Sequence, residues 1–199
     1  LAIGTTADPK PLPTEAVVAV EVVSLNRGEV KAVTNRMKGS RIGWDIAGTV
    51  VAAAEEGRGP KGGQRVVGFV ARADGWAERV AVPAESLAIV PDGMELADAV
   101  TLPVAGLTAL HAVEKGRRIL GRRVLITGAA GGVGLFAVQL AVAAGAEVVA
   151  PIRRPSDETF VKELGATHTP LFDRFGEPEG IEKLGPFPLI VDGVGGGVL

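Results

Sequence analysis

The sequence predicts a chain in two parts, an amino-terminal part rich in β-strands and a carboxy-terminal doubly wound α/β part. Three observations predict this. Short apolar runs broken by glycine, proline and charged residues fill the first half, strand-like and helix-like runs alternate in the second, and a glycine-rich turn joins a strand to a helix there. Closely spaced short strands favour a small barrel or sandwich, whereas alternation favours a parallel sheet. We therefore expect domains over residues 1–100 and 101–199.

The first half contains four strand-like runs and then one mainly helical run. The expected strands are residues 16–25, 46–54, 65–70 and 77–82. Residues 94–113 have a helical pattern that is interrupted near Pro103 and Gly106. Proline removes a backbone donor and glycine weakens a helix, so a break is expected between them.

The second half alternates between strands and helices. The expected order is a strand at 124–127, a helix at 135–144, a strand at 147–150, a polar helix at 156–164 and a strand at 189–192. A sheet that stops at the last of these strands would expose an apolar edge, which invites pairing. The sheet is therefore expected to be incomplete within this sequence, as in a truncated chain or in a homodimer whose partner supplies a strand.

Composition excludes several classes of function. The 199 residues carry a net charge of -2, contain no cysteine, and are 47% hydrophobic. A nucleic-acid-binding domain usually has a clear basic surplus, so no nucleic-acid partner is expected. The absence of cysteine fits a reducing cytoplasm, which is the expected location. The most apolar run, residues 135–146, is too short for a membrane span of about 20 residues, so no membrane partner is expected.

Residues 126–134 read Ile-Thr-Gly-Ala-Ala-Gly-Gly-Val-Gly, between an apolar strand and an apolar helix. In the Gly-x-Gly-x-x-Gly fingerprint, glycines permit a tight turn, close approach of a pyrophosphate and close helix–strand packing. Alignment on the last two glycines places Ala129, Gly131 and Gly134 at these positions. The flanking strand and helix are the context that the fingerprint requires, so we predict a dinucleotide site. A glycine-rich turn with only a structural role is the alternative.

The residues after the second strand of this unit indicate which dinucleotide is bound. NAD-specific sites place an acidic residue about 20 positions beyond the glycines, where it contacts the ribose hydroxyls. Arg153 and Arg154 stand there instead, and guanidinium groups pair well with a 2′-phosphate. The predicted cofactor is NADPH. The alternative is a solvated pair of arginines on a loop.

The sequence offers no plausible zinc site, so no metal is expected. Its two histidines, His111 and His168, lie far apart, and zinc in proteins is typically held by several nitrogen or sulfur ligands. Alcohol oxidation without a Lewis acid lacks its main means of stabilising an alkoxide. Hydride delivery to a conjugated carbonyl is then the easier reaction.

Six short pieces occur in a fixed order along the chain. They are Ser-Leu-Asn at 24–26, Gly-Trp-Asp-Ile-Ala-Gly at 43–48, Gly-Gln-Arg-Val at 63–66, Gly-Trp-Ala-Glu at 75–78, Leu-Pro-Val-Ala-Gly-Leu-Thr-Ala at 102–109 and Ala-Ala-Gly-Gly-Val-Gly at 129–134. Over residues 16–196 the chain resembles the medium-chain dehydrogenase/reductase superfamily, in its zinc-free quinone oxidoreductase-like branch, which also includes enoyl reductases.

This resemblance implies a GroES-like β-barrel followed by a Rossmann domain that binds NADPH. It implies metal-free hydride delivery to a small-molecule quinone or α,β-unsaturated carbonyl (enone), with Asn26 and Thr108 as the catalytic residues. The implied cofactor contacts are Thr108, Ala130, Gly131, Gly132, Val133, Gly134, Arg153, Arg154, Val194 and Gly195. Relatives often carry lysine where this chain has Asp157, and the chain has no tyrosine to protonate the product, so water is the expected proton source.

Several of these residues have simpler explanations. Asn26 is expected either to donate to the substrate oxygen or to cap a turn. Thr108 and His111 fit ordinary helix positions, with His111 expected to be packed, and Asp45 fits a structural role better than that of a catalytic acid.

Two other functions also stay open, a nucleotide-binding scaffold or sensor with weak catalysis, and an enoyl-thioester reductase of secondary metabolism. In that reductase, the phosphopantetheine of a carrier-bound substrate would meet a basic entrance to the site, formed by Arg117, Arg118, Arg122 and Arg123. The alternative is that these four arginines are solvated surface charges.

Overall fold

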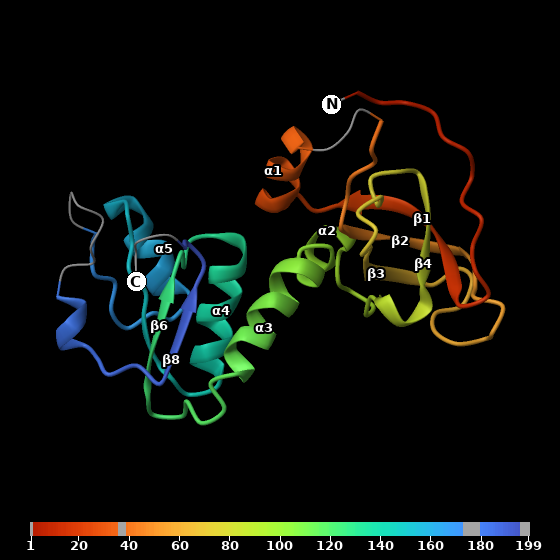
Figure 1. The fold of residues 1–199 in the computed structure, drawn as a ribbon. Helices are drawn as coiled ribbons and strands as arrows, with labels where there is room; N and C mark the ends of the chain where they lie inside the picture. The colour runs from red at the N-terminus through yellow and green to blue at the C-terminus, as the bar shows by residue number, and fades with distance from the viewer. Residues whose placement is uncertain (1, 36–38, 173–179, 196–199) are drawn as a thin grey trace. The chain divides into compact units, whose positions relative to one another are not determined.

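The computed structural model describes residues 2–35, 39–172 and 180–195, and its chain divides into two compact units, Leu1–Val104 and Ala105–Leu199. The sequence places this division after residue 100. Figure 1 shows the sheet of each unit. The predicted fold class, a mainly β part followed by an α/β part, is confirmed.

The first unit is built on a curled antiparallel sheet of five strands in the order β4-β1-β2-β3-β5 (Figure 1). The strands are β1 (Glu15–Val23), β2 (Asp45–Ala52), β3 (Arg65–Phe69), β4 (Arg79–Pro83) and β5 (Leu87–Ile89). The first four overlap the predicted runs. The sequence pattern does not predict β5, because alternation cannot show over only 3 residues.

The strands of this sheet contribute to two separate apolar clusters. The first consists of Ala16, Val18, Ile46, Val50, Val66, Val70, Val80 and Val82. The second consists of Ala47, Val67, Val90, Leu96, Ala99 and Val100. Helix α2 (Leu96–Ala99) supplies part of the second cluster, so it covers the face of the sheet that bears Ala47 and Val67. Valine suits both clusters because β-branched side chains pack well on a pleated surface.

Helix α1 (Arg27–Asn35) lies between the first two expected strands, where the sequence pattern predicts no helix. The N–H of Asn26, just before the helix, donates to the Glu29 carboxylate at 2.7 Å. This is one half of a capping box, in which the third helical residue satisfies the N–H of the residue before the helix. The Asn26 side chain does not complete the box, because it donates to Asp45. Capping therefore starts this helix, and apolar periodicity does not reveal it.

The helical pattern predicted for residues 94–113 is present and is interrupted as expected. After α2 the chain forms a π-helical turn at Leu102–Gly106, which contains Pro103, and then α3 (Leu107–Glu114). Within the described part of the chain, the stretch Leu96–Glu114 would be able to span a membrane by length and composition alone. Core helices of globular proteins pass the same test, so this is weak support for a membrane role.

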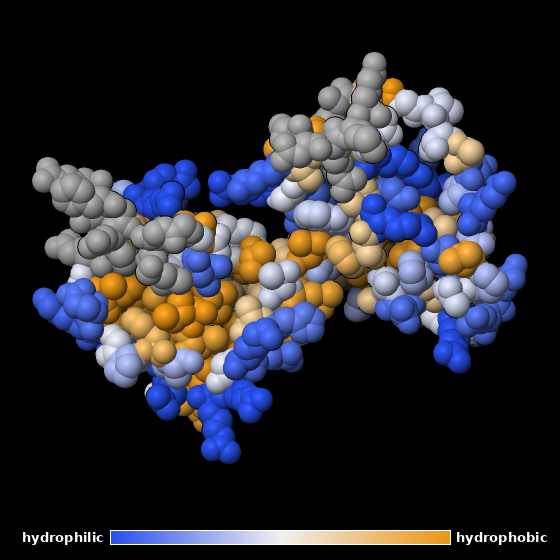
Figure 2. Space-filling model, in the orientation of Figure 1, coloured by the Kyte–Doolittle hydropathy of each residue, from blue (hydrophilic) through white to orange (hydrophobic). Residues whose placement is uncertain are grey.

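The second unit contains a parallel sheet with strand order β7-β6-β8. Its strands are β6 (Arg123–Thr127), β7 (Glu147–Val149) and β8 (Leu189–Asp192), and its longer helices are α3, α4 (Gly132–Ala143) and α5 (Glu158–Glu163). Within the described residues β8 is an edge strand, and Ile190 on it is 45% exposed. Figure 2 shows apolar surface gathered over β6 and β8.

The core of the second unit lies between its helices and the sheet. Its buried members include Val124, Ile126, Ala137, Val138, Ala141, Val148 and Val161. Helix α4 packs on β6 and β7 and against α3. Its buried face is made largely of alanine and valine, whose small side chains let the helix approach the sheet closely. This close packing fixes the position of the turn between β6 and α4.

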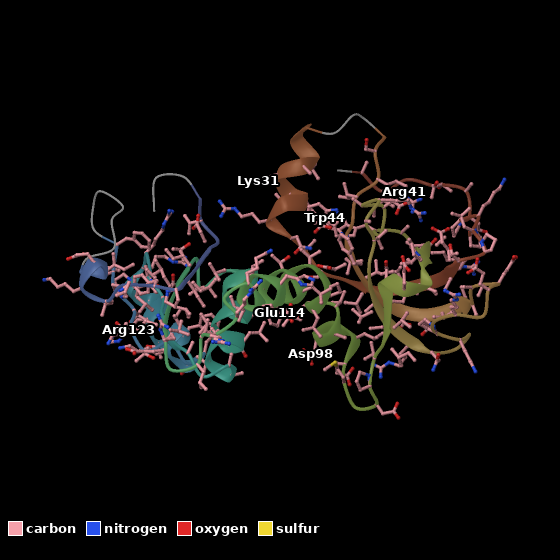
Figure 3. The ribbon with its side chains drawn as sticks, turned by 60° about the horizontal axis from the view of Figure 1, so that its bottom comes forward. Lys31, Arg41, Trp44, Asp98, Glu114 and Arg123 are labelled. Carbon is pink, nitrogen blue, oxygen red and sulfur yellow. The ribbon has the colours of Figure 1, made fainter. Side chains whose placement is uncertain are left out.

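A hydrogen-bonded cluster connects the beginnings of β6 and β7 to His168 and Leu184, which lie later in the chain. Oε1 of Glu147 accepts from Arg123 Nε at 2.9 Å and lies 2.7 Å from His168 Nε2. Arg123, labelled in Figure 3, also donates to the carbonyl oxygen of Leu184 at 3.4 Å. The hydrogen bond with His168, followed by that with Arg123, lowers the pKa of Glu147.

We expect Glu147→Gln to destabilise the chain at neutral pH and to have little effect in acid. A carboxyl whose pKa is lowered in the folded state adds stability above its unfolded pKa and loses it as the pH falls through the folded pKa. Urea unfolding at pH near 7 and near 3 measures the difference. Glu163→Gln is the control, since Glu163 is exposed and has no ion pair among the described residues. An equal loss of stability at both pH values would contradict this account.

Candidate cofactor site and buried polar cluster

The turn after β6 is set by a glycine that the sequence alignment leaves out. Gly128 directly follows the strand and has φ +67°, a left-handed conformation that favours glycine. The Gly131 N–H donates to the Gly128 carbonyl at 2.9 Å and closes the turn. Ala129, which the alignment puts at the first fingerprint position, is instead buried in the core at 1% exposure. The tight-turn role therefore belongs to Gly128, one residue earlier.

Gly134 allows α4 to pack closely on the turn. A Cβ atom at Gly134 would lie 2.1 Å from the Gly128 carbonyl oxygen and 2.7 Å from the Ala129 Cα, both backbone atoms. Gly131 is also close, since its Cβ would lie 3.1 Å from the same oxygen. These positions perform the approach and packing roles that the fingerprint assigns to glycine.

The predicted pyrophosphate contacts lie at the amino terminus of α4. The helix begins at Gly132, earlier than the sequence pattern suggests, and Ala130, Gly131 and Gly132 are exposed. The first N–H groups of a helix have no partner within it, and the helix dipole makes this end positive. An exposed end with small residues can therefore accept a phosphate group.

A hydrogen-bond network joins the carboxyl ends of β6 and β8. The Thr127 hydroxyl donates to the Asp192 carboxylate and accepts from the Gly193 N–H. The N–H groups of Val194 and Gly195 donate to Asp192 at 3.0 Å each. The bond from Thr127, followed by those from the two N–H groups, lowers the pKa of Asp192. Sequence reasoning names Val194 and Gly195 but misses Thr127 and Asp192, which hold their loop in place.

A pocket of about 230 Å³ opens beside this network within the second unit. It is lined by Thr108 and Ala112 of α3, by Lys115 directly after that helix, by Thr127, Val133 and Gly134, and by residues 189–193. The structure thus brings the predicted Thr108, Val133 and Gly134 together at one pocket. Arg153 and Arg154 do not line it.

The two predicted arginines follow β7 and are both exposed. The Arg153 guanidinium lies 5.8 Å from the centroid of the Phe172 ring, as in a cation–π contact. Arg154 instead pairs with Asp157, with Nε 3.1 Å from Oδ2 and Nη2 3.0 Å from Oδ1. Asp157 therefore pairs with one of the two predicted arginines, and its side chain makes no cap for α5.

A cluster of polar side chains is buried in the first unit. Asp45, at 0% exposure, accepts from Asn26 Nδ2 at 2.7 Å and from the Val104 N–H at 2.9 Å. Burial raises the pKa of Asp45, while the bonds from Asn26 and Val104 oppose this rise. One amide hydrogen of Asn26 is therefore engaged, and the other hydrogen and Oδ1 have no bond to Asp45.

Glu29 is the residue of this cluster that sequence reasoning misses. Its side chain is 2% exposed and accepts from the N–H groups of Asn26 and Trp44, both at 2.7 Å. A Cβ atom on Gly28 would lie 2.9 Å from the Trp44 ring, so α1 packs closely on that ring, labelled in Figure 3. The signal in the sequence is the spacing Asn-x-x-Glu at the start of a helix. Glu29 thus fixes both Asn26 and the beginning of β2.

Two further predicted residues differ from expectation. His111 is not packed, because its side chain is 71% exposed and lies 3.7 Å from Glu114. Arg122 and Arg123 lie at the start of β6, the opposite end from the glycine turn, which gives no support to a basic entrance there. Among the described residues, no group of three or more metal-ligating side chains is placed to hold an ion.

Known proteins resemble this chain in sequence and structure. Residues 12–92 match the alcohol dehydrogenase GroES-like domain. A chloroplast envelope quinone oxidoreductase homolog of Arabidopsis thaliana is 35% identical to this chain. The match covers 79% of this chain and 52% of the length of the relative. A probable acrylyl-CoA reductase of Escherichia coli is 34% identical, and the match covers 92% of this chain and 60% of the length of the reductase.

A solved structure of the quinone oxidoreductase from Thermus thermophilus, determined also in complex with NADPH, superposes with a TM-score of 0.71 at 30% identity. It covers 85% of this chain and 55% of that one. The chain spans about half the length of the curated relatives it matches first. The order of its units, the matched domain and these relatives agree, and the chain belongs to the medium-chain dehydrogenase/reductase superfamily, in its quinone oxidoreductase-like branch.

Proposed function

We propose that this chain belongs to an NADPH-dependent oxidoreductase that delivers hydride to a quinone or an α,β-unsaturated carbonyl without a metal. The observation that carries the proposal is the packed glycine turn, in which Gly134 leaves no room for a Cβ beside Gly128. Together with the exposed start of α4, this turn fits the pyrophosphate of a dinucleotide. Similarity to a quinone oxidoreductase solved with NADPH supports the same cofactor.

The bound cofactor would supply the hydride, and the residues of the chain would position it. The N–H groups at the start of α4 would hold the pyrophosphate, and Arg153 and Arg154 would face the 2′-phosphate. Thr108, on the pocket beside Val133 and Gly134, would contact the nicotinamide half, as would the loop of Val194 and Gly195. The Thr127–Asp192 pair would keep that loop in one conformation, which reduces the entropy lost on binding.

On the substrate, the group that gains charge is the carbonyl oxygen. A positioned donor stabilises that charge more than it stabilises the neutral substrate. The second amide hydrogen of Asn26 is the donor we propose, with Asp45 holding the first. Water would supply the proton, since the chain has no tyrosine.

Two observations support a conjugated carbonyl as the acceptor, the names of the relatives and the lack of zinc ligands in the sequence. Two relatives are named as a quinone oxidoreductase homolog and a probable acrylyl-CoA reductase. The second name favours an enoyl thioester as an alternative acceptor. Zinc independence is supported by the sequence, which has no cysteine and only two histidines.

The test is oxidation of NADPH by the purified chain with quinones, enones and enoyl thioesters, followed by absorbance of the reduced nicotinamide. We expect turnover with at least one acceptor class, unchanged by a metal chelator. Asn26→Ala should lower kcat with little change in NADPH affinity, whereas Glu163→Gln should match the parent chain. Tight NADPH binding without oxidation by any acceptor would favour a scaffold or sensor, and loss of turnover with the chelator would contradict metal independence.

A further inference from the structure

The pair formed by Arg154 and Asp157 is built into the local fold. The Asp157 N–H donates to the Arg154 carbonyl at 2.9 Å across the 3-10 turn Pro155–Asp157. Proline at the first position of this turn restricts its backbone. The Asp157 side chain is 18% exposed, whereas that of Arg154 is 74% exposed. The carboxylate is therefore the fixed partner, and the guanidinium closes onto it from the solvent.

The contact uses one edge of the guanidinium. Nε and Nη2 of Arg154 each face one oxygen of Asp157, at 3.1 and 3.0 Å. This is the two-bond arrangement with which arginine also binds phosphate. A 2′-phosphate must then displace Asp157 or use the remaining edge of Arg154 with a carboxylate nearby.

Arg153 has a different environment. Its contact is with the face of the Phe172 ring, which restricts the guanidinium and leaves its N–H donors available. No carboxylate of the described residues forms an ion pair with Arg153. The two adjacent arginines are thus unequal, one already neutralised and one available for an anion.

We propose that Asp157 is a determinant of coenzyme selectivity, which lowers the preference for NADPH over NADH by competing with the 2′-phosphate for Arg154. Arg153 then supplies most of the preference. This inference rests on the proposed nicotinamide cofactor. The competition is moderate, because exposed ion pairs are weak and a dianionic phosphate is a stronger partner than a carboxylate.

The experiment measures the dissociation constants of NADPH and NADH separately, by fluorescence titration of the parent chain and of Asp157→Asn. We expect the variant to bind NADPH about 2- to 5-fold more tightly, the range that an exposed ion pair allows. NADH binding should be unchanged, because NADH has no 2′-phosphate. The ratio of the two constants is therefore the readout, and it does not depend on turnover.

The control is Glu158→Gln, the neighbouring residue. Glu158 also forms an ion pair, with Oε1 2.6 Å from Lys162 Nζ and its side chain 47% exposed, and the substitution removes the same charge from the same segment. A general effect of charge on NADPH binding would appear in both variants, whereas a specific effect on Arg154 appears only in Asp157→Asn.

Two arginine variants test the unequal roles proposed for Arg153 and Arg154 in binding the 2′-phosphate. Arg153→Ala should weaken NADPH about 10-fold, as expected for loss of a charge-assisted contact to phosphate. Arg154→Ala should weaken it less than Arg153→Ala does, and in the Arg154→Ala background Asp157→Asn should have no further effect. The comparison of Arg153→Ala with Arg154→Ala also covers the case in which Asp157→Asn folds poorly.

The outcomes separate the two proposals. An unchanged NADPH-to-NADH ratio in Asp157→Asn, or an Arg154→Ala loss as large as that of Arg153→Ala, would overturn the role of Asp157 while the cofactor proposal stands. Failure of the parent chain to bind either coenzyme would overturn both.

Discussion

Gly134→Ala is expected to lower the free energy of unfolding by about 2 kcal/mol and to abolish NADPH binding. The new Cβ would lie 2.1 Å from the Gly128 carbonyl oxygen and 2.7 Å from the Ala129 Cα, and backbone atoms cannot rotate away. Overpacking a tight site costs about 1–3 kcal/mol, with a backbone clash at the upper end. Alanine returns about 1 kcal/mol through its helix propensity. Urea unfolding and a fluorescence titration with NADPH measure the two effects.

The matched control is Gly132→Ala, two residues earlier in the same helix. A Cβ there has Ala105 Cβ at 4.0 Å as its nearest neighbour, an ordinary contact distance. The stability of this variant should equal or slightly exceed that of the parent chain. If Gly134→Ala were as stable as Gly132→Ala, the close packing of α4 on the turn would not exist in solution.

Glu29→Ala is expected to lower the free energy of unfolding by about 2–4 kcal/mol. It removes the acceptor of two N–H groups, those of Asn26 and Trp44, at a site that is 2% exposed. Each buried donor left without a partner costs about 1–3 kcal/mol. Because Asn26 loses its anchor, turnover with any acceptor should fall as well. Chemical denaturation measures the stability, and the NADPH oxidation assay measures the turnover.

Two further variants show whether the loss of stability comes from the buried contacts of Glu29. Glu21→Ala removes an exposed glutamate whose side chain accepts one hydrogen bond among the described residues, from the Thr49 hydroxyl at 2.8 Å. It should change stability by less than about 0.5 kcal/mol. Glu29→Gln keeps the size but turns one acceptor into a donor, so it should be intermediate. A loss in Glu29→Ala no greater than in Glu21→Ala would contradict the anchoring role.

The broad architecture is predictable from the sequence because it depends on periodic burial. Strands such as β8 and the helix interruption at Leu102–Gly106 follow from apolar runs and from proline and glycine. Helix α1 does not, because it buries the charged Glu29 and leaves Val30 62% exposed, and because its start depends on a capping contact. Capping is a local hydrogen bond, which the spacing Asn-x-x-Glu permits but does not require.

The site is only partly predictable for a related reason. The glycine motif correctly locates a tight turn, yet its spacing cannot tell whether Gly128 or Ala129 adopts the left-handed conformation. Likewise, adjacent arginines identify a candidate phosphate site, but the carboxylate three residues after Arg154 meets it only because a 3-10 turn brings them together. Burial of Glu29 depends on contact with Trp44, which is distant in the sequence.

Binding of a dinucleotide at the amino terminus of α4 and at the turn before it can be tested amide by amide. The most direct measurement is a proton–nitrogen correlation spectrum of the isotope-labelled chain, recorded during titration with NADPH. We expect the largest shifts at the amides of Ala130, Gly131 and Gly132, and we expect Gly134→Ala to remove them. Saturation with NADPH that shifts other amides but leaves these three unchanged would contradict it.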